Sequence, residues 1–136
     1  MGCEASATHA SMGCQASAAP RQPSATAGEH FDQGAAEADL QYIQSATAFL
    51  DQEAEDACFL CWPRSHAHHQ RLTAGTWRGR SHWVPLTDAE LDSLRAAGLA
   101  PKRVPVNRGD VIVWRSDLVH CGTAPTARST PRPQPQ

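Results

Sequence analysis

Three short apolar runs in the middle of the chain, each bounded by turn-forming residues, constrain its fold more than any other feature. They are LQYIQSATAFL at 40–50, ACFLCW at 57–62 and VIVW at 111–114. Each contains the β-branched or aromatic residues that favour strands. The first run predicts a strand buried on both faces. Pro63 ends the second run, and the turn sequence NRGD at 107–110 leads into the third.

One helix is expected between the second and third runs. Thr87 and Glu90 have the spacing of a capping box, in which each side chain bonds the backbone amide of the other. Leu86 and Leu91 flank this box as a hydrophobic staple, and Gly98 supplies a left-handed end. Several strands with one inserted helix predict a mainly β fold, a sandwich or barrel rather than a βαβ fold.

The two ends of the chain differ in composition from its middle. Residues 1–28 are rich in Ala, Ser and Pro and low in apolar residues, so burial there cannot offset the entropy of ordering. We therefore expect a disordered leader at 1–28. Prolines recur through the segment 123–136, which rules out a central strand and predicts a Pro-rich tail. The folded unit is expected over 29–122.

Charge and cysteine usage limit the partners and the compartment. The 12 basic and 14 acidic side chains are spread without blocks, which disfavours a nucleic-acid partner. No window approaches the roughly 18 apolar residues of a membrane span, so no transmembrane segment is expected. Five cysteines, an odd number without a regular framework, indicate free thiols in a reducing compartment such as the cytoplasm.

The most conspicuous metal-type residues are Cys58 and Cys61 followed by His66, His68 and His69. Thiolates and imidazoles suit zinc, so a zinc-binding module is one hypothesis. However, the two pairs are closer than in a zinc finger, and strand residues three apart point to opposite faces. We therefore predict buried, metal-free cysteines and solvated loop histidines.

A second set is less conspicuous. His30 and Asp32 are two residues apart, and in an extended segment such side chains emerge on the same face. His120 lies at the end of the third strand, before a Gly-containing turn. Together they offer two imidazoles and one carboxylate, the facial set that leaves open positions on a non-heme Fe(II).

The order of these segments resembles a known family. HFDQ, LQYIQSATAFLD, ACFLCWPRSH, the capped helix and VNRGDVIVWRSDLVHCG are similar to the phytanoyl-CoA dioxygenase family of Fe(II)- and 2-oxoglutarate-dependent oxygenases. In that family a His-x-Asp, a Pro-Gly-Ser-His turn and a Gly-Asp-strand-His run recur in this order. Over 29–122 the resemblance implies a double-stranded β-helix, a jelly-roll or cupin-like core, with His30, Asp32 and His120 as iron ligands.

The resemblance also implies a reaction. Fe(II), 2-oxoglutarate and O₂ would together hydroxylate a small organic or acyl substrate. An arginine shortly after the last ligand would grip the far carboxylate of 2-oxoglutarate through its planar fork. Arg128 and Arg132 compete for this role, and spacing favours Arg132. Gln44 and Trp114 are candidates to face the same cavity.

Three departures from the family pattern keep other readings open. Arg64 stands where the family has the glycine of Pro-Gly-Ser-His, the tail after His120 is Pro-rich, and little precedes His30. A truncated or partial member is therefore expected, with an incomplete core. An inactive fragment or pseudo-enzyme, and a zinc-binding or metal-free β-sandwich binding module, remain the alternatives.

Overall fold

The computed structural model describes residues 28–36, 38–74 and 82–126. The predicted leader, except for Gly28, and the tail from residue 127 lie outside these ranges. The strands are β1 (His30–Phe31), β2 (Ile43–Thr47), β3 (Phe59–Cys61), β4 (Val84–Pro85), β5 (Lys102–Val104), β6 (Val111–Arg115) and β7 (His120–Gly122). The helices are the 3₁₀ turn η1 (Ser65–His68), α1 (His69–Thr73) and α2 (Asp88–Ala96).

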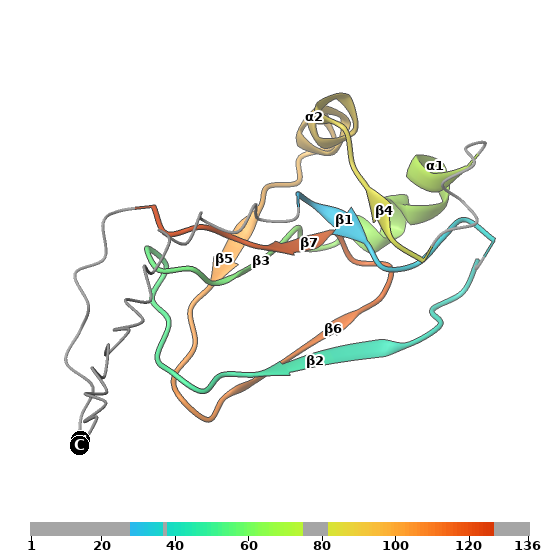
Figure 1. Cartoon of the computed structure of the whole chain (residues 1–136). Helices are drawn as coiled ribbons and strands as arrows, with labels where there is room; N and C mark the ends of the chain where they lie inside the picture. Colours follow the sequence, from blue (N-terminus) through green and yellow to red (C-terminus); the bar gives the residue numbers. More distant parts are fainter. Residues whose placement is uncertain (1–27, 37, 75–81, 127–136) are drawn as a thin grey trace, which may run out of the picture.

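The strands form two antiparallel sheets. A five-stranded sheet has the order β4-β1-β7-β3-β5, and β2 pairs with β6 in a separate two-stranded ribbon. Figure 1 shows this ribbon along one face of the larger sheet, with α1 and α2 on the other side. The described part of the chain is thus mainly β, as predicted, and its larger sheet lies between a ribbon and a helical layer.

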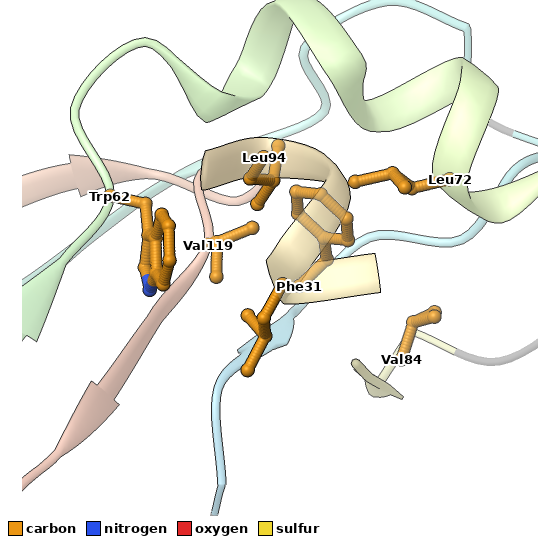
Figure 2. Packing of buried hydrophobic residues seen from close by; sticks show 7 residues of the cluster. Phe31, Trp62, Leu72, Val84, Leu94 and Val119 are labelled. Atoms are coloured by element: carbon orange, nitrogen blue, oxygen red, sulfur yellow. The ribbon is translucent and has the colours of Figure 1, made fainter. Parts of the chain in front are cut away.

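The hydrophobic core lies between the larger sheet and the helices. Because strand side chains alternate, Phe31 of β1 enters this core while its neighbour His30 faces the ribbon side. Trp62 and Val119 flank β3 and β7, and both are fully buried against the same cluster. Figure 2 shows their packing beside Leu94 of α2. The remaining buried members are Leu72, Val84 and Leu91.

Helix α2 forms as its capping signals predict. The Thr87 hydroxyl accepts from the Glu90 amide at 3.3 Å, and the Thr87 amide donates to the Glu90 carboxylate at 2.7 Å. Gly98 follows the helix with φ of +80°, a conformation that a side chain would strain. The periodicity of the helix places Leu91 and Leu94 toward the sheet, so the helix covers the core.

The structure corrects the prediction for the first apolar run. Strand β2 is shorter than 40–50, and it is not buried on both faces: Ile43 is 56% exposed and Phe49 is 81% exposed. The physical reason is that β2 has one strand partner and one covered face. The side chains that alternate outward from a two-stranded ribbon meet solvent.

The structure also corrects the number of helices and the placement of the histidine run. Instead of a solvated loop, Ser65–His68 and His69–Thr73 form η1 and α1, and His69 is 2% exposed. Arg64 precedes η1 with φ of 70°, which is the left-handed conformation that a glycine would adopt at no steric cost. The Ser65 hydroxyl accepts from the Val119 amide at 2.8 Å and so links this turn to the start of β7.

Candidate metal centre

His30, Asp32 and His120 converge on the ribbon side of the larger sheet. β1 and β7 are neighbours, and His30 lies directly opposite His120 in their register. One ligand atom from each of the three residues lies within 4.8 Å of the other two. Within 28–36, 38–74 and 82–126, this is the one group of three ligand-type side chains that meets so closely.

Backbone carbonyls determine which imidazole nitrogens remain free. His30 Nδ1 lies 2.7 Å from the Gly28 oxygen, and His120 Nδ1 lies 3.0 Å from the Leu118 oxygen. A carbonyl can only accept, so each Nδ1 carries the proton and donates. In the neutral ring, Nε2 then presents its lone pair, which is the form that binds a metal.

The two Nε2 atoms face the carboxylate of Asp32. His30 Nε2 lies 3.6 Å from Oδ1, and His120 Nε2 lies 3.3 Å from Oδ2. Burial lowers the pKa of His120, and it outweighs the bond to the Leu118 carbonyl and the nearby Asp32 charge, which raise it. In the tautomer that the backbone carbonyls fix, two Nε2 lone pairs and a carboxylate face one point. A cation bound there would satisfy all three groups, so the donor set fits a divalent metal ion.

Asp32 is held by three contacts on the ribbon side. Its amide donates to the Ser116 carbonyl at 3.0 Å, and its carbonyl accepts from the Tyr42 hydroxyl. Gln44 of β2 donates from Nε2 to Oδ2 of the carboxylate at 2.7 Å. The ribbon therefore fixes both the backbone and the carboxylate of this candidate ligand.

Gln33 forms a buried brace directly after Asp32. The Ser116 hydroxyl donates to its Oε1 at 2.6 Å, and its Nε2 donates to the Asp39 carbonyl at 2.8 Å. His69 Nε2 donates to its backbone carbonyl at 2.7 Å. His69, one histidine of the conspicuous run, therefore supports the site by bonding the backbone of Gln33, the residue after Asp32. We did not predict either role from the sequence.

Aromatic rings surround the site. The rings of Phe59 and Trp114 lie 5.6 Å and 5.2 Å from that of His120, and 4.7 Å from each other. Trp83, which is 51% exposed, lies 5.9 Å from the His30 ring. The rings of Phe59 and Trp114 therefore shield the ligand set from inside, while Trp83 stands at its exposed side.

A cavity of about 310 Å³ adjoins this site between β2, β3, β6 and β7. Phe59 separates it from His120, since the same ring lines the cavity and stacks on the histidine. Its lining is mainly apolar, with no charged side chain among the described residues. It consists of Ala46, Thr47, Ala48, Gln52, Ala57, Cys58, Phe59, Ile112, Gly122 and Thr123.

The other predicted site residues are not members of this group of three in the described structure. Arg128 and Arg132 fall outside the described residues. Cys58 is buried and contacts the Thr123 hydroxyl at 3.7 Å, whereas Cys61 is half-buried. Burial raises the pKa of the Cys61 thiol despite the charge of Lys102. In the ranges that the structure covers, no group of three or more ligand-type side chains includes either cysteine, although Cys61 lies opposite His120 in the β3-β7 register.

The turn between β6 and β7 is fixed by an ion pair. Arg115 donates from Nε and Nη2 to the two oxygens of Asp117 at 2.8 Å and 2.7 Å. Burial favours a higher pKa for Asp117, but the bonds and charge of Arg115, with smaller contributions from His66 and His69, lower it overall. This turn delivers Ser116 to Asp32 and Gln33, and it leads into His120.

No helix in the described ranges has the length and apolar character that a membrane crossing requires. Comparisons of the chain with protein-family models, with curated proteins and with solved structures found no match.

Proposed function

We propose that the chain is a non-heme Fe(II)- and 2-oxoglutarate-dependent dioxygenase that hydroxylates a small organic or acyl substrate. The observation that carries this proposal is the convergence of two imidazole Nε2 atoms and one carboxylate within 4.8 Å. Such a set of two histidines and one carboxylate occupies one face of Fe(II) and leaves positions open for other ligands.

His30, Asp32 and His120 would hold the iron. When bound, iron with 2-oxoglutarate and O₂ supplies the oxidising chemistry, in which loss of CO₂ to give succinate accompanies hydroxylation of a substrate C–H bond. The chain's own task is to orient and shield. The Gly28 and Leu118 carbonyls fix the two rings, and Phe59 and Trp114 exclude water from the inner side of the site.

The cavity beside Phe59 would hold the far carboxylate end of 2-oxoglutarate, while the keto-acid end would lie on the metal side of Phe59, beside Trp114. The volume of this cavity is in the range of small-molecule sites. The cavity offers 2-oxoglutarate neutral polar groups from Thr47, Thr123 and Gln52. A dicarboxylate also needs a cation. Arg132, or Arg128 in its place, would supply that cation, because both residues follow β7 closely in the chain.

The arrangement of the sheets supports a double-stranded β-helix core as part of this proposal. In such a jelly-roll type of fold, two sheets face each other and enclose the site. Here the candidate ligands lie on the face of the larger sheet that the β2-β6 ribbon covers, and Trp114 of β6 reaches His120 of β7.

The test is succinate formation by the full chain with Fe(II), ascorbate and 2-oxoglutarate, with and without candidate substrates. The wild type should form succinate, and His120→Ala should lose nearly all of it. His68→Ala is the matched control, since His68 lies in η1 and outside the ligand set. Equal succinate from wild type and His120→Ala would refute the enzyme proposal.

Metal analysis separates the alternatives. An inactive fragment or pseudo-enzyme would bind iron through His30 and form no succinate. A zinc module would instead retain stoichiometric zinc in His30→Ala and lose it when Cys58 and Cys61 are replaced by serine. A metal-free binding module would retain no metal in any variant.

A further inference from the structure

Gln44 and Trp114 form a cross-strand pair on the inner face of the ribbon. They are directly opposite in the β2-β6 register. Side chains at opposed positions of an antiparallel pair lie next to each other on the same face. Gln44 contacts the Asp32 carboxylate on this face, and Trp114 contacts the His120 ring. The pair therefore borders two of the three candidate metal ligands.

The contact with Asp32 fixes the orientation of the Gln44 amide. A carboxylate oxygen accepts hydrogen bonds, so the amide nitrogen, at 2.7 Å from Oδ2, must be the atom that faces it. Asp32 Oδ2 is thus engaged by Gln44, while Oδ1 is the oxygen nearer to His30. Groups that hold a ligating carboxylate in this way typically strengthen metal binding.

The remaining polar atoms of the pair have no partner in the part of the chain that the structure describes. Gln44 Oε1 and Trp114 Nε1 are both buried and make no hydrogen bond to any described residue. Buried polar groups in folded proteins are nearly always satisfied, and an exception calls for a specific cause. Oε1 can only accept and Nε1–H can only donate. An acceptor and a donor are therefore left over beside the same candidate site.

We propose that Gln44 and Trp114 act together as positioning residues, holding Asp32 on one side and a bound, oxygen-bearing small molecule on the other. The molecule supplies an oxygen that accepts from Trp114 Nε1–H and a hydroxyl, or a bridging water, that donates to Gln44 Oε1. This inference rests on the proposed function, because it assigns roles around the same metal centre.

The first test is titration of the full chain with Co(II), followed by its visible spectrum. Gln44→Met keeps an unbranched side chain of similar length but cannot donate to Asp32. It should weaken Co(II) binding by about 10- to 100-fold and change the ligand-field bands. Gln41→Met is the matched control, because the Gln41 side chain is exposed and bonds only the Asp39 carbonyl among the described residues.

The second test is binding of 2-oxoglutarate to the Co(II)-loaded chain. Trp114→Phe keeps an aromatic ring beside Phe59 and His120 but removes the N–H donor. It should leave Co(II) affinity within twofold of wild type and weaken 2-oxoglutarate binding by about tenfold.

The outcomes are separable. Wild type that binds no Co(II) would overturn the proposed function and this inference with it. Normal wild-type binding, with Gln44→Met unchanged in affinity and spectrum, or with Trp114→Phe unchanged toward 2-oxoglutarate, would overturn the inference alone. If Gln44→Met does not fold, Gln44→Thr provides the same comparison, since threonine favours strands and is too short to reach Asp32.

Discussion

Replacing Gln33 with leucine tests whether the buried brace behind Asp32 stabilises the fold. Gln33 is 0% exposed, and its side chain accepts from the Ser116 hydroxyl at 2.6 Å and from the Gln41 amide at 3.2 Å. Its Nε2 also donates to the Asp39 carbonyl at 2.8 Å. Leucine has a similar volume but can replace none of these bonds.

The expected loss of stability depends on which former hydrogen-bond partners of Gln33 are buried and which are exposed to water. Ser116 is 0% exposed, so its stranded hydroxyl should cost about 1–3 kcal/mol. Gln41 and Asp39 are exposed, so their lost bonds should cost only about 1 kcal/mol each. Burial of the more apolar leucine offsets part of this. We expect Gln33→Leu to lower the free energy of unfolding by about 2–4 kcal/mol.

Urea unfolding followed by tryptophan fluorescence measures this loss. The midpoint should fall while the slope of the transition stays unchanged, because the surface exposed on unfolding is similar. Gln41→Leu is the control and should change the free energy by no more than about 0.5 kcal/mol. A loss below about 1 kcal/mol in Gln33→Leu would show that water replaces the Ser116 contact and would refute the argument.

Three further predictions concern stability. Arg64→Gly should stabilise the fold by about 1 kcal/mol in chemical denaturation, since φ of 70° strains any side chain; a destabilised variant would contradict this. Leu94→Ala should cost about 2–5 kcal/mol in the same assay, because Leu94 is 0% exposed in the core; a loss below about 1 kcal/mol would contradict its central position. The ion pair between Arg115 and Asp117 lowers the pKa of Asp117 in the folded state. This pair therefore stabilises the fold fully at pH values above the ordinary carboxyl pKa of about 3.9, and the stabilisation is lost as the pH falls through the lower pKa of the folded state. Unfolding free energies at neutral pH and near pH 3 should therefore differ less in Asp117→Asn than in wild type, and an equal difference would exclude this role.

Local signals in the sequence were sufficient for the parts of the fold that depend on neighbouring residues. The capping box at Thr87 and the left-handed Gly98 formed as predicted because cap geometry needs only a few adjacent residues. Strand β6 was also found from its β-branched run. The proximity of His30, Asp32 and His120 was expected from a family resemblance, and the structure does bring the three together.

The features that sequence reasoning missed depend on distant partners. Ile43 and its neighbours were predicted to be buried, but burial of β2 depends on whether further strands flank it, which the local pattern does not encode. Gln33 has no local signal, since its partner Ser116 lies 83 residues away. His69, Leu72 and Thr73 are buried at helical spacing, and this periodicity was a usable signal for α1 that the apparent metal character of the run obscured.

The most direct test of the account is an anaerobic Fe(II) titration of the full chain and of three single variants, each with one candidate ligand replaced by alanine. We predict one Fe(II) per wild-type chain and at least roughly tenfold weaker binding in His30→Ala, Asp32→Ala and His120→Ala. Equal Fe(II) binding by wild type and all three variants would contradict the central claim that these side chains form the metal centre.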